Sequence, residues 1–112
     1  QASYKSSRLK CRMRLCVSGL GEDPRQHRDT GRCRNCNEFE SMKHFMFKCP
    51  AYENERHQML TFIKTNTSET VFNDFIQDLD CALYSLLGDH DNVFNVAMLT
   101  YLDSAWNVRS KL

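Results

Sequence analysis

The sequence predicts a mainly α-helical protein, in which a small cysteine-rich ribbon lies between a basic N-terminal helix and a C-terminal helical portion of about three helices. Over most of the chain, apolar residues recur at intervals of three and four, the period of a helix packed on a core. The exception is segment 33–49, which gathers three of the six cysteines and a histidine. A chain of 112 residues with 41% hydrophobic residues suits one folded domain, so we expect residues 1–112 to form a single domain.

The first predicted helix spans residues 4–20 and is strongly basic. Its apolar positions fall on one face: Leu9, Met13, Cys16 and Leu20. Lysines and arginines flank this face on both sides, and glycines near residue 20 end the helix. A polar connector with turn-forming residues follows over residues 22–32.

Three further helices are predicted, over residues 50–64, 69–87 and 93–110. Pro50 suits the first turn of a helix, and Thr67 or Ser68 is the expected N-cap of the helix at 69–87. Gly88 ends that helix, and residues 89–92 predict a turn and a cap for the last one. Cys81 lies among apolar residues of 69–87, so we expect it to be a small core residue.

Segment 33–49 has the pattern C-x2-C-x7-H-x4-C, formed by Cys33, Cys36, His44 and Cys49. Zinc prefers four soft or borderline ligands in a tetrahedron, which three thiolates and one imidazole supply. Two residues between the first two thiols allow a tight turn that points both sulfurs inward. Because four protein ligands leave no open coordination position, the sequence predicts one structural Zn2+ ion and no catalytic metal.

Other states of the cysteines stay open at this point. An even number of cysteines in a small protein is also compatible with a disulfide framework or with buried thiols. Cys11 and Cys16 lie five residues apart on the first helix, about 140° around its axis, and cannot share a metal ion there. We expect both to be core or partly exposed thiols.

The net charge of +1 hides an asymmetry between the two halves of the chain. Residues 1–50 carry 11 basic and 5 acidic side chains, whereas residues 51–112 carry 4 basic and 9 acidic ones. The basic half suits a polyanion such as RNA or DNA, although the two halves could instead pack together and partly neutralise each other. The residues expected to contact nucleic acid are Lys5, Arg8, Lys10, Arg12, Arg14, Arg32, Arg34, Lys43 and Lys48.

Three phenylalanines in the cysteine segment are candidates for stacking on unpaired bases. For Phe45 and Phe47, packing beneath the metal site is the favoured interpretation. Phe39 lies in an acidic loop and is the better stacking candidate. Arg56 is expected to pack its stem against the metal module and to pair with Glu38 or Glu40.

Several short motifs within residues 5–63 together carry a family resemblance: Arg8-Leu9-Lys10 with Arg12 and Arg14, the cysteine box, Glu38 and Glu40, His44-Phe45, Cys49-Pro50-Ala51-Tyr52 and Arg56. They resemble the CCHC segment downstream of the reverse transcriptase in LINE-type (non-LTR) retrotransposon polyproteins. The later helices fit that pattern more loosely, through an apolar stretch ending near Leu87 and a closing helix with Arg109. The resemblance implies a nucleic-acid-binding accessory domain that acts beside the rest of a larger polyprotein, or a domain derived from one.

No enzyme is expected from this sequence, because it carries no nucleophile elbow, HExxH motif, phosphate-binding glycine loop or deaminase motif. The alternative function is a zinc-stapled protein-protein interaction module that uses the acidic helices at 69–87 and 93–110. No apolar run is long enough to cross a membrane, so we expect an intracellular protein, nuclear or cytoplasmic. Since the chain begins without Met or a leader, we expect it to be part of a longer one.

Overall fold

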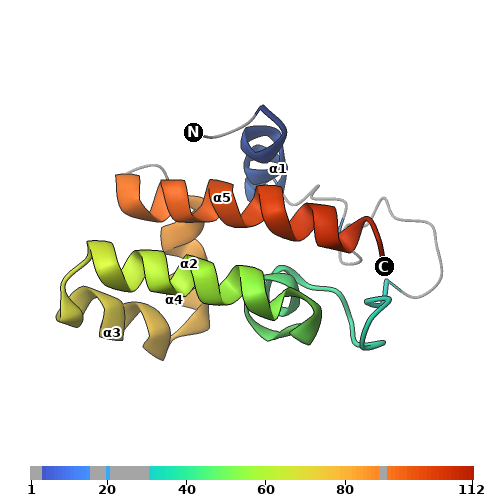
Figure 1. Cartoon of the computed structure of the whole chain (residues 1–112), viewed down its shortest axis with the longest axis horizontal. Helices are drawn as coiled ribbons and strands as arrows, with labels where there is room; N and C mark the ends of the chain where they lie inside the picture. The colour runs from blue at the N-terminus through green and yellow to red at the C-terminus, as the bar shows by residue number, and fades with distance from the viewer. Residues whose placement is uncertain (1–3, 16–19, 21–30, 89–90) are drawn as a thin grey trace.

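The computed structural model describes residues 4–15, 20, 31–88 and 91–112. Its α-helices are α1 (Tyr4–Arg14), α2 (Glu53–Asn66), α3 (Glu69–Gln77), α4 (Leu79–Leu87) and α5 (Asn92–Arg109), with a π-helical turn (His44–Lys48) and a 3-10 turn (Pro50–Tyr52) before α2 (Figure 1). The described residues form no sheet, and a single antiparallel bridge joins Arg32 to Phe39. The predicted class is confirmed: the protein is mainly α, with the cysteine cluster between the N-terminal helix and the C-terminal helices.

Helix α5 is the element on which the others pack. It contacts α2 along one side and also contacts α1 and α4 (Figure 1). Met98, Leu102 and Ala105 on α5 are fully buried in the resulting core. A cluster of aromatic rings joins the cysteine segment to α5: the ring of Phe45 meets those of Tyr52, Tyr101 and Trp106 edge to face, with centroids 4.8–5.6 Å apart.

Helix α1 packs on α5 through one face. Ser6, Leu9, Lys10 and Met13 are buried, at the spacing of three and four that places them on one side of a helix. The described helix ends at Arg14, whereas the sequence predicts a helix to residue 20. Residues 16–19 and most of the predicted connector lie outside the described residues, while Leu20 is buried as expected.

The prediction of a single helix over 69–87 is wrong, because the helix is interrupted at Asp78 and forms two helices, α3 and α4. Asp78 has extended backbone angles and its carboxylate accepts from the N–H of Asp80 (2.9 Å) and of Cys81 (3.4 Å), which makes it the N-cap of α4. The prediction of Cys81 as a core residue is also wrong, because the interruption at Asp78 changes which residues face the core. Cys81 lies in the exposed first turn of α4, with its sulfur 3.6 Å from a carboxylate oxygen of Asp78.

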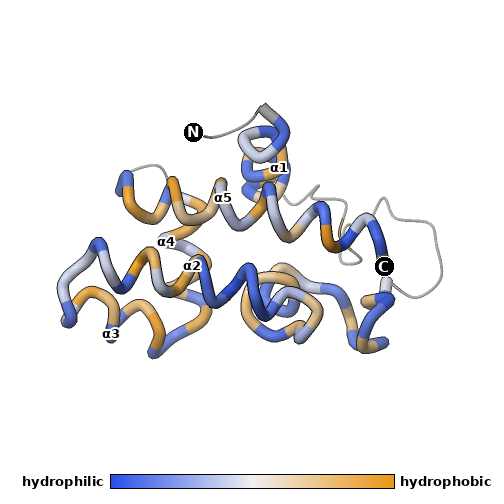
Figure 2. The backbone as a smooth tube through the Cα atoms, viewed as in Figure 1, coloured by the Kyte–Doolittle hydropathy of each residue, from blue (hydrophilic) through white to orange (hydrophobic). Residues whose placement is uncertain are grey.

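Three other predicted helix ends are confirmed, whereas the helix predicted over 50–64 begins as the 3-10 turn at Pro50–Tyr52 and continues as α2 to Asn66. Ser68 caps α3 by accepting from the N–H of Val71 (3.2 Å), Asp91 caps α5 by accepting from Val93 (2.9 Å), and α4 ends at Gly88. The first half of α2, residues 53–58, is hydrophilic throughout, whereas polar and apolar residues are interspersed along α5 (Figure 2). Among the helices of the described residues, none has the length and apolar character needed to span a membrane.

Candidate metal centre

A tight turn carries the first two cysteines of the cluster. Asn37 adopts a left-handed backbone conformation (φ 60°), and its N–H donates to the carbonyl of Cys33 (2.9 Å). The N–H of Cys33 in turn donates to the carbonyl of Glu38 (2.7 Å). This turn points the sulfurs of Cys33 and Cys36 toward each other, 3.8 Å apart, as the C-x2-C spacing predicts.

A π-helical turn carries the other two residues of the cluster. The N–H of Cys49 donates to the carbonyl of His44 (2.8 Å), five residues earlier, so the widened turn brings the two residues together. The hydroxyl of Ser41 accepts from the N–H of His44 (3.1 Å) and satisfies a donor at the start of this turn. The π-helical turn thus brings His44 and Cys49 next to the turn that carries Cys33 and Cys36.

The four side chains form one compact group. The sulfurs of Cys33, Cys36 and Cys49 lie 3.6–3.8 Å from one another, and the Nε2 atom of His44 lies 3.2 Å from the sulfur of Cys36. All four donor atoms lie within 4.8 Å of one another. A zinc–sulfur bond of about 2.3 Å gives a tetrahedral edge of about 3.8 Å, so the sulfur triangle fits a zinc ion. The separations exceed the disulfide bond length of about 2.05 Å, and the cysteines are free thiols, which excludes a disulfide among these three.

Burial disfavours the ionised form of the cysteines in this cluster. Cys33, Cys49 and His44 are buried, and Cys36 is half-buried. Burial raises the pKa of Cys36, and it raises the pKa of Cys49 to about 12. A divalent cation supplies the charge that lets such thiols ionise, so the donor set fits a single metal ion, and zinc suits it best.

The metal-facing nitrogen of His44 is Nε2, since this atom lies toward Cys36. Its other nitrogen, Nδ1, is buried and has no hydrogen-bond partner among the described residues. The nearest carboxylate oxygen, on Glu38, lies 3.8 Å away. Histidine ligands commonly donate their second N–H to a carboxylate, so Glu38 is placed to orient the His44 ring.

Arg56 of α2 holds the main chain of the metal module. Its Nε atom donates to the carbonyl of Met46 (3.0 Å), and Nη2 donates to the carbonyl of Cys49 (2.7 Å). The prediction that Arg56 packs against the module is therefore confirmed. The predicted pairing of Arg56 with Glu38 or Glu40 is wrong, because the carbonyls of the π-helical turn take its donors instead.

Glu40 pairs with Arg109 at the end of α5. The two side chains form a bidentate ion pair, with distances of 2.8 and 2.7 Å, and the guanidinium lies over the ring of Trp106. Burial lowers the pKa of Arg109, but the hydrogen bond and charge of Glu40 outweigh burial and raise it overall. Sequence reasoning missed this pair, which spans 69 residues. The available signal was an acidic residue on the ribbon and an arginine in the closing helix.

The structure places most of the basic residues predicted to contact nucleic acid at the surface. Lys5, although exposed, donates to the side chain of Asn107 (2.9 Å), and Arg34 donates to the carbonyl of Leu112 (3.3 Å). The exposed members of the predicted set are Lys5, Arg8, Arg12, Arg14, Arg32, Arg34 and Lys48.

Two predicted contact residues have other roles in the fold. Lys10 is only 5% exposed, and its ammonium donates to the carbonyl of Gly88 (3.0 Å) and to the side chain of Asn95. It therefore ties α1 to the end of α4 and to α5, and we leave it out of the proposed interface. Lys43 forms an ion pair with Asp80 (2.8 Å), which raises the pKa of the lysine.

The three phenylalanines of the cysteine segment differ in exposure. Phe45 is fully buried in the aromatic cluster, and Phe47 is half-buried against the core, as expected for residues beneath the metal site. Phe39 is 55% exposed.

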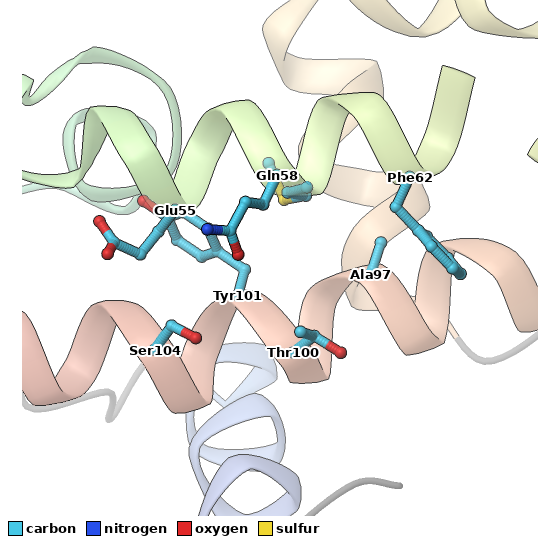
Figure 3. A pocket seen from close by; sticks show the side chains of 8 residues that line it. Glu55, Gln58, Phe62, Ala97, Thr100, Tyr101 and Ser104 are labelled. Carbon is cyan, nitrogen blue, oxygen red and sulfur yellow. The ribbon is translucent and has the colours of Figure 1, made fainter. Parts of the chain in front are cut away.

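A shallow groove of about 220 Å³ lies between α2 and α5. Figure 3 shows Glu55, Gln58 and Phe62 on the α2 side, facing Thr100 and Ser104 on α5. Glu55 is the only carboxylate among the residues that line it, and no histidine or cysteine accompanies it.

The chain matches no known family model, and neither a curated protein nor a solved structure matches it.

Proposed function

We propose that this protein is a zinc-dependent nucleic-acid-binding domain in which the metal ion has a structural role. The observation that carries the proposal is the Cys3His cluster with exposed arginines both on its ribbon and on α1. Once bound, zinc would join the ribbon to the π-helical turn. The four protein ligands fill a tetrahedral shell, so the proposal includes binding and no catalysis.

Helix α1 supports this proposal through its two faces. Leu9 and Met13 are buried against the core, whereas Lys5, Arg8 and Arg12 are exposed at intervals of three and four. Residues at these intervals form one row along a helix, which suits a row of phosphate groups. The helix is thus anchored by its apolar face and offers a basic row to a polyanion.

The ribbon carries a second set of exposed basic side chains. Arg32, Arg34 and Lys48 are exposed and lie within one residue of a metal ligand. A metal ion that fixes Cys33 and Cys49 would also fix the backbone that carries these side chains. Binding to nucleic acid is therefore expected to depend on the metal.

The motifs shared with LINE-type polyproteins favour a more specific role. We infer an accessory domain of a retrotransposon-type reverse transcriptase protein, or a domain derived from one, acting inside the cell in the nucleus or the cytoplasm. Its partners are RNA or DNA and the remainder of the polyprotein. The largely buried pair Glu40–Arg109 joins the cysteine ribbon to the closing helix, the part of the chain that fits the resemblance more loosely.

One observation favours a second candidate function, a protein-protein interaction module. Helices α3 and α4 contain no lysine or arginine, and they expose Val71 (42%), Ile76 (47%) and Tyr84 (72%). Exposed apolar side chains beside acidic ones suit a partner protein better than a phosphate backbone.

The test compares nucleic-acid binding of the zinc-loaded protein with that of a variant carrying Arg8→Gln, Arg12→Gln and Arg14→Gln, over a series of salt concentrations. Each lost phosphate contact lowers the slope of log affinity against log salt by about 0.9 for duplex DNA. The control carries Lys64→Gln and Lys111→Gln, which remove two exposed positive charges from the acidic half, against three removed from α1.

The expected result is weaker and less salt-dependent binding by the arginine variant only, and loss of binding on chelation of zinc. Zinc content and circular dichroism verify that each variant is folded. Equal binding by the arginine variant, or no binding at low salt by a folded, zinc-loaded protein, would reject the proposal and favour the interaction module.

A further inference from the structure

We propose that Phe39 and Arg32 form a stacking site for an unpaired base, so that the ligand of this domain is a single-stranded nucleic acid. This inference rests on the proposed function and makes it more specific. The residues lie opposite each other on the two arms of the cysteine ribbon, joined by its antiparallel bridge.

The main-chain hydrogen bonds define the bridge as a non-hydrogen-bonded pair. They lie on either side of it, from the N–H of Cys33 to Glu38 (2.7 Å) and from the N–H of Glu40 to Gly31 (3.0 Å). In such a pair, the two opposing side chains lie on the same face and closer together than in the hydrogen-bonded kind. The guanidinium stem of Arg32 and the ring of Phe39 are therefore neighbours on one face of the ribbon.

This face points to solvent because the opposite face is used by the fold. The next residue on each arm, Cys33 and Glu40, is buried, at 2% and 5% exposure. Since side chains alternate between faces along an extended arm, Arg32 and Phe39 point outward. Phe39 is 55% exposed, and within the part of the chain that is described its ring stacks on no other aromatic ring.

The surroundings of the ring suit a polyanion. Arg32 donates one hydrogen bond from Nη1 to the carbonyl of Asn37 (3.0 Å), which holds the guanidinium at the turn. A guanidinium carries five N–H donors, so others are available to a phosphate oxygen. Arg34 is a second exposed cation on the same turn. Glu38, the residue before Phe39, contributes an exposed carboxylate to the same region.

A ring beside a guanidinium selects single strands on physical grounds. In a duplex the faces of the bases are covered by their neighbours, whereas an unpaired base can stack on an exposed ring. Such stacking is tolerant of sequence, since every base has an aromatic face. RNA and DNA share this chemistry, so both are tested.

The experiment measures the affinity of the zinc-loaded full chain for single-stranded RNA, single-stranded DNA and duplex DNA. Phe39→Ala is expected to weaken binding to the single strands about tenfold, which is within the range for one base–aromatic stack, and to leave duplex binding unchanged. The salt dependence should stay the same, because the ring carries no charge. The matched control is Tyr84→Ala, which removes an exposed ring from acidic α4.

A second variant makes the stack directly visible. Phe39→Trp should retain the affinity for single strands, and the fluorescence it adds to that of Trp106 should be quenched by single strands and not by duplex. Zinc content shows that each variant retains the metal site. A preference of one single-stranded arm over the other identifies RNA or DNA as the ligand.

The outcomes separate this inference from the proposed function. If the single strands bind Phe39→Ala as tightly as the wild type, while the arginine variant of α1 binds weakly, the stacking site is rejected and the phosphate-binding domain stands. An equal loss of duplex and single-strand binding by Phe39→Ala also rejects the stacking site. If the wild type binds none of the three ligands, both proposals are rejected.

Discussion

The hydroxyl group of Tyr101 donates a hydrogen bond of 2.5 Å to the main-chain carbonyl of Phe45, 56 residues earlier in the chain. This carbonyl lacks a donor from its own turn. The N–H of Cys49 is taken by His44, and the next residue, Pro50, has no N–H to give. Helix α5 therefore supplies the hydrogen bond that the metal module cannot make for itself, at a site where an unpaired carbonyl would be costly.

Two tyrosine variants test this relationship. Tyr101→Phe should lower the free energy of unfolding by about 1–3 kcal/mol, because the buried carbonyl of Phe45 loses its donor. Tyr52→Phe should be neutral or stabilising, because the buried hydroxyl of Tyr52 has no partner among the described residues. Denaturant unfolding of the two zinc-loaded variants measures both effects. Equal destabilisation by the two substitutions contradicts the assignment.

The ion pair between Glu40 and Arg109 is expected to stabilise the contact between the ribbon and α5. Its two side chains are 6% and 18% exposed, so Glu40→Gln leaves a largely buried guanidinium without a counter-charge. We expect a loss of about 2–4 kcal/mol, slightly below the range for fully buried pairs. Glu53→Gln, an exposed site in the first turn of α2, is the control.

A double-mutant cycle with Arg109→Gln isolates the pairing itself. The loss for both substitutions together should be clearly smaller than the sum of the two single losses, because the second removes a charge that the first left unpaired. Strict additivity means that the two residues act independently, and the pair then contributes nothing to stability.

Metal removal should unfold the module. Chelation is expected to abolish the contacts of the ribbon, since zinc binding contributes about 10–16 kcal/mol of apparent free energy in comparable small sites. Cys36→Ser should abolish tight binding of one zinc ion, whereas Cys11→Ser and Cys81→Ser should keep it, because both of these thiols are exposed and neither belongs to the four-residue cluster. Cobalt substitution and its thiolate absorption report the binding. Zinc bound at full affinity by Cys36→Ser excludes the four-ligand assignment.

Glu38 should tune the affinity of the site without being a ligand. Its carboxylate lies 3.8 Å from the buried Nδ1 of His44, so Glu38→Ala removes the group that orients the ring. Losses of 10-fold to 100-fold in metal affinity are typical for such changes, and we expect about tenfold here because Glu38 is exposed. Competition with a chelator of known affinity measures it. An unchanged affinity assigns the orientation of His44 to the backbone alone.

Alkaline pH should destabilise the fold. Burial raises the pKa of both Tyr52 and Tyr101 above the ordinary value of 10.0. A raised pKa in the folded state means that the stability contributed is fully present below about pH 10 and is lost as the pH rises beyond it. The midpoint of denaturant unfolding should thus fall steeply above that pH. The drop should be smaller for Tyr101→Phe, and an equal drop points to other groups.

The clustering of the four candidate metal ligands and several helix ends could be predicted from the sequence, because their signals are local. Two cysteines three positions apart can point both sulfurs to one ion across a tight turn, and Ser68 and Asp91 cap the helices that begin next to them. The aromatic residues beneath the site also followed from local pattern. Phe45 and Phe47 lie between two candidate ligands in the sequence, which favoured packing beneath the site over stacking on a base, and both are at least half-buried.

The features that could not be predicted depend on residues distant in the chain or on a weak local competition. At Asp78 an N-cap interrupts an apolar period that continues through the break, so the pattern alone favours one helix. The burial of Lys10 depends on a carbonyl 78 residues away, at Gly88. The nucleic-acid role of the exposed arginines stays a prediction.

The anchoring of the ribbon by α5 bears on how this domain can be inherited. Two groups of the ribbon and its turn have their partners near the C-terminus: Arg109 supplies the counter-charge of Glu40, and Tyr101 supplies the donor to the carbonyl of Phe45. A recombination event that transferred only the cysteine box to another gene would leave Glu40 without its counter-charge and the carbonyl of Phe45 without its donor. The smallest transferable unit therefore extends at least from Gly31 to Arg109, which makes this metal site far less portable between genes than an autonomous zinc finger.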